Sequence, residues 1–128
     1  MAENLSIIKV EDVLLVTIPS DPDDETIARL QSGILESMKK YNVKGVVLDI
    51  SAVETMDSYF ARVIIETAQM VSLMGGKTVI AGMRPSVAIT TAQLGLTLKG
   101  VETAIDVETA MNKLKKESSD FSEGKEKK

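Results

Sequence analysis

Short apolar runs separated by helical patterns follow one another along most of the chain. Five of these runs predict β-strands: SIIKV (6–10), VLLVTI (13–18), GVVLDI (45–50), KTVIAG (77–82) and GVETAI (100–105). Only Glu11 and Asp12 separate the first two runs, which predicts a hairpin, although Glu-Asp is not a favoured turn pair. The run 45–50 is continuously apolar up to its aspartate, as is typical of a parallel strand covered on both faces.

The segments between the strands carry the period of amphipathic helices. In the first of them we expect Asp21 to cap the helix and Pro22 to take its first position. One face of this helix is apolar, and it comprises Ile27, Leu30, Ile34, Met38 and Tyr41. Gly33 weakens the helix by roughly 1 kcal/mol relative to alanine, so tertiary packing must hold it.

Three further helices are expected, over 58–74, 85–94 and 107–116. In the first of these, one side is largely apolar, with Phe60, Ile64, Thr67, Val71 and Met74, and the other is polar, with Tyr59, Arg62, Glu66 and Gln69. Glycines at 75–76 and at 95 end the first two helices. Pro85 opens the second and Asp106 caps the third.

The element order is therefore β-β-α-β-α-β-α-β-α, an α/β fold with about four helices. Right-handed crossovers make the sheet mostly parallel, with an antiparallel N-terminal hairpin strand at one edge. The length of 128 residues suits a single domain. We place this domain at 1–116. The remaining segment 117–128, ESSDFSEGKEKK, is almost devoid of apolar residues, so we expect a disordered charged tail.

Composition narrows the possible functions. The net charge of −4 argues against nonspecific nucleic-acid binding, because phosphates attract an excess of Lys and Arg. No apolar run reaches the length of a membrane span, and the N-terminus does not read as a signal peptide. The sequence has no Cys and no His, which removes thiol chemistry, the usual general base and the commonest metal ligand.

Two motifs that suggest phosphate chemistry have simpler interpretations. GGKT (75–78) resembles the end of a phosphate-binding loop, but position 71 is Val where that loop needs Gly. The motif also runs from helix to strand, the reverse of such a loop, and so indicates a turn. Asp49 near the end of a central strand resembles a receiver-domain phosphoacceptor, but the acidic pair Glu11-Asp12 falls in the hairpin loop instead.

A metal site is a further alternative. Asp49, Glu54 and Asp57 lie around one predicted loop, and hard cations prefer carboxylate ligands. Acids in such a loop are more often solvated helix caps. We therefore expect neither a metal ion nor a cofactor.

The stretch LDISAVETMDSYFARV (48–63) begins as a strand and ends as a helix. Ser58 at this junction can be an ordinary helix cap and nothing more. If Asp57 serves as the cap, Ser58 lies in the first turn, where a phosphate is tolerated. An exposed Tyr59 beside it is best explained by a partner that covers it. The residues alone leave both interpretations open.

Family resemblance favours the second interpretation. The element order and VVLDISAVETMDSYFARVI resemble the STAS domain of anti-sigma factor antagonists, in which an Asp-Ser pair at the start of the second helix carries a regulatory phosphoserine. Asp57-Ser58 matches that pair. With GMRPSVAITTAQLGLTLKGVETAIDVETAMNKLKK, the chain is similar over about 6–116 to the small scaffold branch of the bacterial stressosome. Tyr59-Phe60 departs from the Ser-Gly that ordinary antagonists usually carry and agrees with this branch.

The resemblance implies a cytoplasmic scaffold without catalytic activity. It would sequester a switch-type serine kinase and release it when Ser58 is phosphorylated, and a serine phosphatase would reset the serine. It would form a dimer alone and a large complex with sensor-bearing STAS paralogues, without nucleic acid or membrane. We expect Glu54, Asp57, Tyr59 and Arg62 to contact partners. The alternative is an ordinary anti-sigma factor antagonist that binds its kinase one to one.

Overall fold

The computed structural model describes residues 5–94 and 101–126. Its five strands are β1 (Ser6–Val10), β2 (Val13–Thr17), β3 (Gly45–Asp49), β4 (Lys77–Ala81) and β5 (Glu102–Ala104). Its helices are α1 (Asp24–Tyr41), α2 (Ser58–Leu73), α3 (Pro85–Gln93) and α4 (Val107–Glu126). The strands form one sheet in the order β1-β2-β3-β4-β5, in which β1 is antiparallel to β2 and the other pairs are parallel. The predicted α/β architecture is confirmed.

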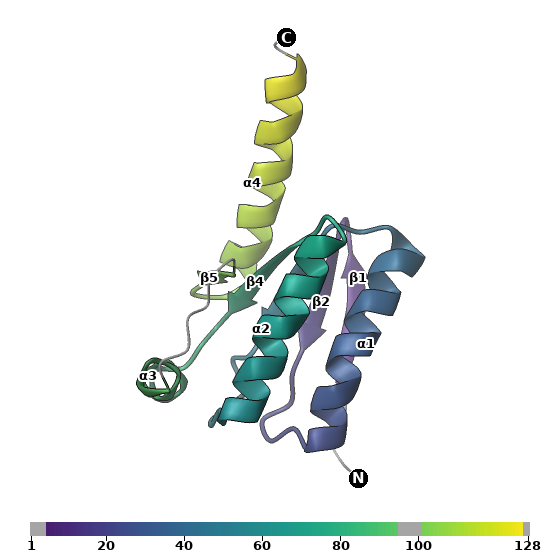
Figure 1. Cartoon of the computed structure of the whole chain (residues 1–128). Helices are drawn as coiled ribbons and strands as arrows, with labels where there is room; N and C mark the ends of the chain where they lie inside the picture. The colour runs from purple at the N-terminus through teal and green to yellow at the C-terminus, as the bar shows by residue number, and fades with distance from the viewer. Residues whose placement is uncertain (1–4, 95–100, 127–128) are drawn as a thin grey trace.

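The sheet is covered by helices on both faces. Helices α1 and α2 lie side by side on one face (Figure 1), where Leu14, Leu48 and Ile80 join the larger apolar core. On the opposite face, Ala110 and Leu114 of α4 pack against a smaller cluster of strand residues. Successive residues of a strand point to opposite faces, which is why continuously apolar strands are buried on both sides.

The start of α1 differs from the prediction. Asp23, not Asp21, is the N-cap, and its carboxylate accepts a 2.7 Å hydrogen bond from the Thr26 amide. This bond lowers the pKa of Asp23 below its ordinary value, because it favours the ionised form. Pro22 therefore precedes the cap instead of opening the helix. The local sequence offers several aspartates, and the cap falls on the one placed three residues before Thr26.

The buried faces of α1 and α2 follow the predicted periodicity except at their ends. Tyr41 and Met74, both expected to face inward, are 42% and 46% exposed, because one is the last residue of α1 and the other follows the end of α2. Gly33 in the middle of α1 is explained by packing, since a Cβ atom there would lie 2.9 Å from the Ile7 Cδ1 atom of β1. The strand and the helix approach closely at this point.

The starts of the last two helices agree with the prediction. Asp106 caps α4 as expected and accepts a 2.8 Å hydrogen bond from the Thr109 amide, which lowers the pKa of Asp106. Pro85 begins α3, whereas its expected end at Gly95 lies outside the described residues. Strand β5 comprises Glu102–Ala104, within the predicted run 100–105.

Helix α4 is longer than the prediction, which ended it at Lys116. It continues to Glu126 and extends past the body of the domain (Figure 1). The segment contains no proline, so nothing in the covalent structure stops the helical hydrogen-bond ladder there. The division between a domain at 1–116 and a tail at 117–128 stays a prediction. No helix in the described part of the chain is long and apolar enough to cross a membrane.

Removing the tail tests this division. A chain that ends at Lys116 retains Ala110 and Leu114, the residues by which α4 is buried. It also retains Lys113, whose ammonium donates a 3.0 Å hydrogen bond to the Thr103 carbonyl. We therefore expect its melting temperature to stay within a few degrees of the full chain, measured by circular dichroism. A large drop would show that the segment 117–128 packs on the domain.

Candidate functional site

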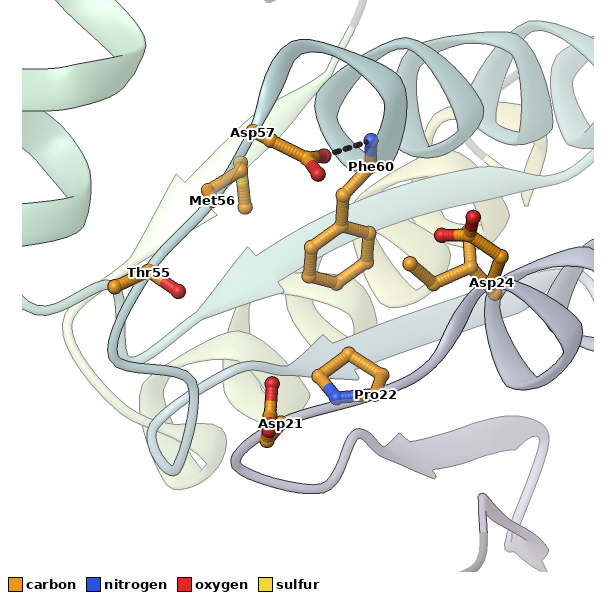
Figure 2. A pocket seen from close by; sticks show the side chains of 8 residues that line it. Asp21, Pro22, Asp24, Thr55, Met56, Asp57 and Phe60 are labelled. Atoms are coloured by element: carbon orange, nitrogen blue, oxygen red, sulfur yellow. Dashed lines mark hydrogen bonds between the residues drawn. The ribbon is translucent and has the colours of Figure 1, made fainter.

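Ser58 is the first residue of α2, and Asp57 is its N-cap. The Asp57 carboxylate accepts a 2.8 Å hydrogen bond from the Phe60 amide (Figure 2), and the Asp57 carbonyl accepts a 3.1 Å bond from the Ala61 amide. The first bond satisfies an amide of the first turn that has no partner within the helix, and the second is the first regular backbone bond of the helix. Asp57 therefore performs the capping, and Ser58 is not needed for it.

The Ser58 side chain is consequently available to solvent. The residue is exposed, and within the described ranges its hydroxyl has no hydrogen-bond partner. It lies at the positive end of the α2 dipole, which favours a negative group. The arrangement presents a nucleophilic oxygen at the protein surface without a general base of the histidine type, because the sequence contains no His.

The backbone that carries Ser58 is anchored by buried neighbours. Met56 before it and Phe60 after it are only 5% and 3% exposed. Tyr59 and Arg62 lie on the outward side of the same helix, and Tyr59 is 41% exposed. The predicted division of α2 into an apolar and an outward side is therefore confirmed around the site, and it places Ser58, Tyr59 and Arg62 together at the surface.

A shallow hollow lies between the N-terminal ends of α1 and α2 and is lined by Asp57, the residue before Ser58 (Figure 2). Its apolar floor includes Pro22, Ile27 and Phe60. Asp21 and Asp24 come from the β2–α1 region and Asp57 from the start of α2, so three carboxylates surround the hollow. The hollow next to the Asp57 cap is therefore negatively charged.

The structure does not gather the three acids of the metal alternative. The Asp49 carboxylate instead accepts hydrogen bonds from the Ser51 amide at 3.0 Å and the Ser51 hydroxyl at 2.7 Å. The Glu54 carboxylate lies 3.7 Å from the Arg84 guanidinium, whereas Asp57 caps α2. Throughout residues 5–94 and 101–126, no group of three or more acidic, histidine or cysteine side chains could hold a metal ion.

Sequence reasoning missed the residues that hold the loop before Ser58. The Arg84 Nε–H donates a 2.8 Å hydrogen bond to the Ser51 carbonyl, and the Ser86 hydroxyl donates a 3.4 Å bond to the Glu54 carbonyl. Both donors belong to the segment GMRPSVA, which the sequence distinguished only by family resemblance. One physical signal was available: loops that follow neighbouring parallel strands meet at the same edge of a sheet.

Comparison with known proteins agrees with this architecture. Residues 4–110 match the STAS domain. The solved structure of the S58E variant of Moorella thermoacetica RsbS is 33% identical, with a TM-score of 0.81, and the comparison covers 91% of this chain and 99% of that one. A structure described as the molecular architecture of the stressosome, a signal integration and transduction hub, contains a chain that is 35% identical. Its TM-score is 0.78, with 88% of this chain and 98% of that chain covered.

A longer relative is known from Bacillus subtilis (strain 168). Its RsbT co-antagonist protein RsbRA is 29% identical over 107 residues, which cover 76% of this chain and 39% of that protein. The chain thus spans about two fifths of the length of this relative. The domain match and the two solved structures cover most of the present chain. The chain therefore belongs to the STAS-domain family, and within it to the RsbS-like proteins of the stressosome.

Proposed function

We propose that this protein is a non-enzymatic stressosome scaffold that sequesters a switch-type serine kinase and releases it when Ser58 is phosphorylated. The observation that carries the proposal is the first turn of α2, where the Asp57 cap leaves the Ser58 hydroxyl exposed and without a partner. The names of the relatives support it: one is RsbS, and another is a co-antagonist of RsbT. The RsbS structure contains glutamate in place of a serine, a substitution that introduces negative charge.

The kinase contact surrounds the acceptor. Tyr59 and Arg62 form the outward side of α2 next to Ser58, while Glu54 and Asp57 supply acidic groups on the approach to the helix. A partly exposed tyrosine is well suited to an interface, because its ring contributes a large apolar area and its hydroxyl a hydrogen bond. We therefore assign these four residues to the partner surface.

Phosphorylation changes the charge at this surface with little effect on the fold. The phosphate adds about −1.5 to −2 charges. The helix N-terminus attracts it by about 0.3–1 kcal/mol, and Arg62, one turn further along the helix, adds about 0.2–0.5 kcal/mol. Repulsion from the Asp57 carboxylate in watery surroundings is on the order of 1 kcal/mol. These contributions nearly offset one another, so the folded domain is retained.

Phosphorylation of Ser58 must therefore exert its regulatory effect at an interface with a partner. A docked kinase removes water from Ser58, and burying a dianion without a full set of partners is unfavourable by several kcal/mol. The carboxylates of Asp21, Asp24 and Asp57 around the neighbouring hollow make burial of a further negative group still less favourable. One phosphate can thus expel the kinase without remodelling the domain, and a serine phosphatase restores binding.

The scaffold role requires more than one contact surface, since one self-complementary surface produces only closed dimers. Strand β1 is an edge of the sheet, and its Ile8 is 51% exposed. The second surface is the segment 84–98, of which the structure describes residues up to 94; Ile89 on α3 is 58% exposed. We assign β1 and α3 to contacts with further copies and with a sensor-bearing STAS paralogue.

The first expected outcome concerns the acceptor. With ATP and the partner serine kinase, the wild-type chain gains one phosphate, and peptide mapping places it on Ser58. Ser58→Ala folds normally and stays unmodified, because its hydroxyl is absent. Intact mass spectrometry measures both. Stoichiometric phosphorylation of Ser58→Ala would refute the assignment.

Thermal denaturation distinguishes the two residues at the start of α2. Asp57→Ala removes the cap and should lower stability by about 1 kcal/mol, which corresponds to a decrease of about 4 °C in melting temperature. Ser58→Ala and Ser58→Asp should remain close to wild type, since the hydroxyl has no partner and the local charge effects offset. If Ser58→Ala is destabilised as much as Asp57→Ala, the serine contributes to capping and its role as a free acceptor is wrong.

Light scattering during size-exclusion chromatography tests assembly. The chain alone should elute as a homodimer, and its mixture with a sensor-bearing paralogue should form a particle far larger than a dimer. Ile8→Asp and Ile89→Asp, each of which places a charge on an assigned contact surface, should reduce that particle. If the mixture contains only small dimers across a wide range of protein and salt concentrations, the scaffold proposal fails and the ordinary antagonist takes its place.

A further inference from the structure

We infer that Arg84 is a positioning residue for Ser58, acting through the loop that connects β3 to α2. This inference rests on the proposed function of Ser58 and extends it to how the serine is presented. The loop spans residues 50–57 and ends at the cap of α2. It carries two of the four residues assigned to the partner surface, so its conformation decides where the acceptor and its acidic neighbours lie.

Arg84 holds this loop from the segment that follows β4. Its Nε–H donates a 2.8 Å hydrogen bond to the Ser51 carbonyl, and its Nη1 atom lies 3.7 Å from a Glu54 carboxylate oxygen. The side chains of Arg84 and Glu54 are 46% and 69% exposed, so the ion pair is screened by water and contributes little. The hydrogen bond from the charged guanidinium to the Ser51 carbonyl is therefore the contact by which Arg84 restrains the loop, in addition to the bonds that Ser51 donates to Asp49.

Two residues of α3, the helix that Arg84 precedes, also contact this loop. The Ser86 hydroxyl donates a 3.4 Å bond to the Glu54 carbonyl, and the Thr91 hydroxyl lies 3.7 Å from the sulfur of Met56. Arg84, Ser86 and Thr91, which we call the α3 clasp, thus contact the loop at three successive points. These points, at Ser51, Glu54 and Met56, follow one another along the sequence toward Ser58.

The chain segments that follow β3 and β4 pack closely against each other next to the clasp. Gly82 has φ of +78°, and a Cβ atom there would lie 2.9 Å from the Ser51 Cβ and 3.3 Å from its Cα. The Ile50 amide donates a 3.0 Å hydrogen bond to the Ala81 carbonyl just before this point. The chain leaving β4 therefore passes directly against the chain leaving β3, which allows Arg84 to reach the Ser51 carbonyl.

The consequence concerns the rate of phosphoryl transfer more than the affinity for the kinase. The outward side of α2 remains available for docking without Arg84, because Tyr59 and Arg62 are not part of the clasp. A loosened loop leaves the Ser58 hydroxyl in the reactive orientation for a smaller fraction of encounters, and misorientation of a reacting group reduces the catalytic rate steeply. Loss of a direct kinase contact would instead raise KM.

Two measurements on Arg84→Ala test the inference. Amide hydrogen exchange of peptides covering 50–57 in the protein alone should become several-fold faster. Steady-state phosphorylation by the kinase should show a decrease in kcat that exceeds the change in KM. Arg84→Lys, which retains the charge but lacks the fork of donors, should recover part of both effects. Ser86→Ala should change both quantities in the same direction as Arg84→Ala and to a smaller extent.

Lys44→Ala serves as the control. It removes the same charge at the opposite end of β3 and should leave loop exchange and kinetics at wild-type values. Unchanged exchange and unchanged kcat in Arg84→Ala would overturn the inference. A rise in KM alone, with unchanged loop exchange, would also overturn it by making Arg84 a direct kinase contact. If wild type is not phosphorylated on Ser58, the proposed function fails, while hydrogen exchange still decides whether Arg84 orders the loop.

Discussion

The hydrogen bond from the Phe60 amide to the Asp57 carboxylate determines what the start of α2 can do. In this bond the residue before Ser58 accepts from a free amide of the first helical turn. The serine hydroxyl is therefore left at the surface without an intramolecular partner. Phe60 of α2 is buried in the larger apolar core, so the same bond joins the exposed start of the helix to that core. Ser58 thus has a defined backbone and an unrestrained side chain, as its proposed role as a kinase substrate within a folded domain requires.

The charge distribution around Ser58 is consistent with the proposed switch, in which phosphorylation acts on a partner without unfolding the protein. In water, the helix dipole and Arg62 would attract a phosphate on Ser58, whereas the Asp57 carboxylate would repel it. Each contribution is about 1 kcal/mol or less. Under a docked partner the same charges are no longer screened by solvent, and their interactions become several times stronger. The proposed switch arises because these charge interactions are weak when Ser58 is solvated and strong when a partner covers it.

Hydrophobic periodicity predicted the strands, the helices and the buried side of α2, because burial of apolar area dominates the formation of these elements. The cap of α1 was predicted at Asp21 and lies at Asp23, since both residues have the required chemistry and only the backbone geometry separates them. Helix α4 continues past the predicted end at Lys116, because no proline or other local signal in the sequence marks where it stops. The clasp of Arg84 on Ser51 joins residues distant in sequence, and no local pattern of residues encodes such a contact.

The affinity of the kinase for unmodified and Ser58-phosphorylated protein tests the central claim most directly. Isothermal titration of the kinase into both forms, each shown to be folded by circular dichroism, provides the comparison. We expect phosphorylation to weaken binding by tenfold or more, which corresponds to a loss of about 1.4 kcal/mol or greater, while the two forms melt at similar temperatures. Equal affinities for the two forms would contradict the account.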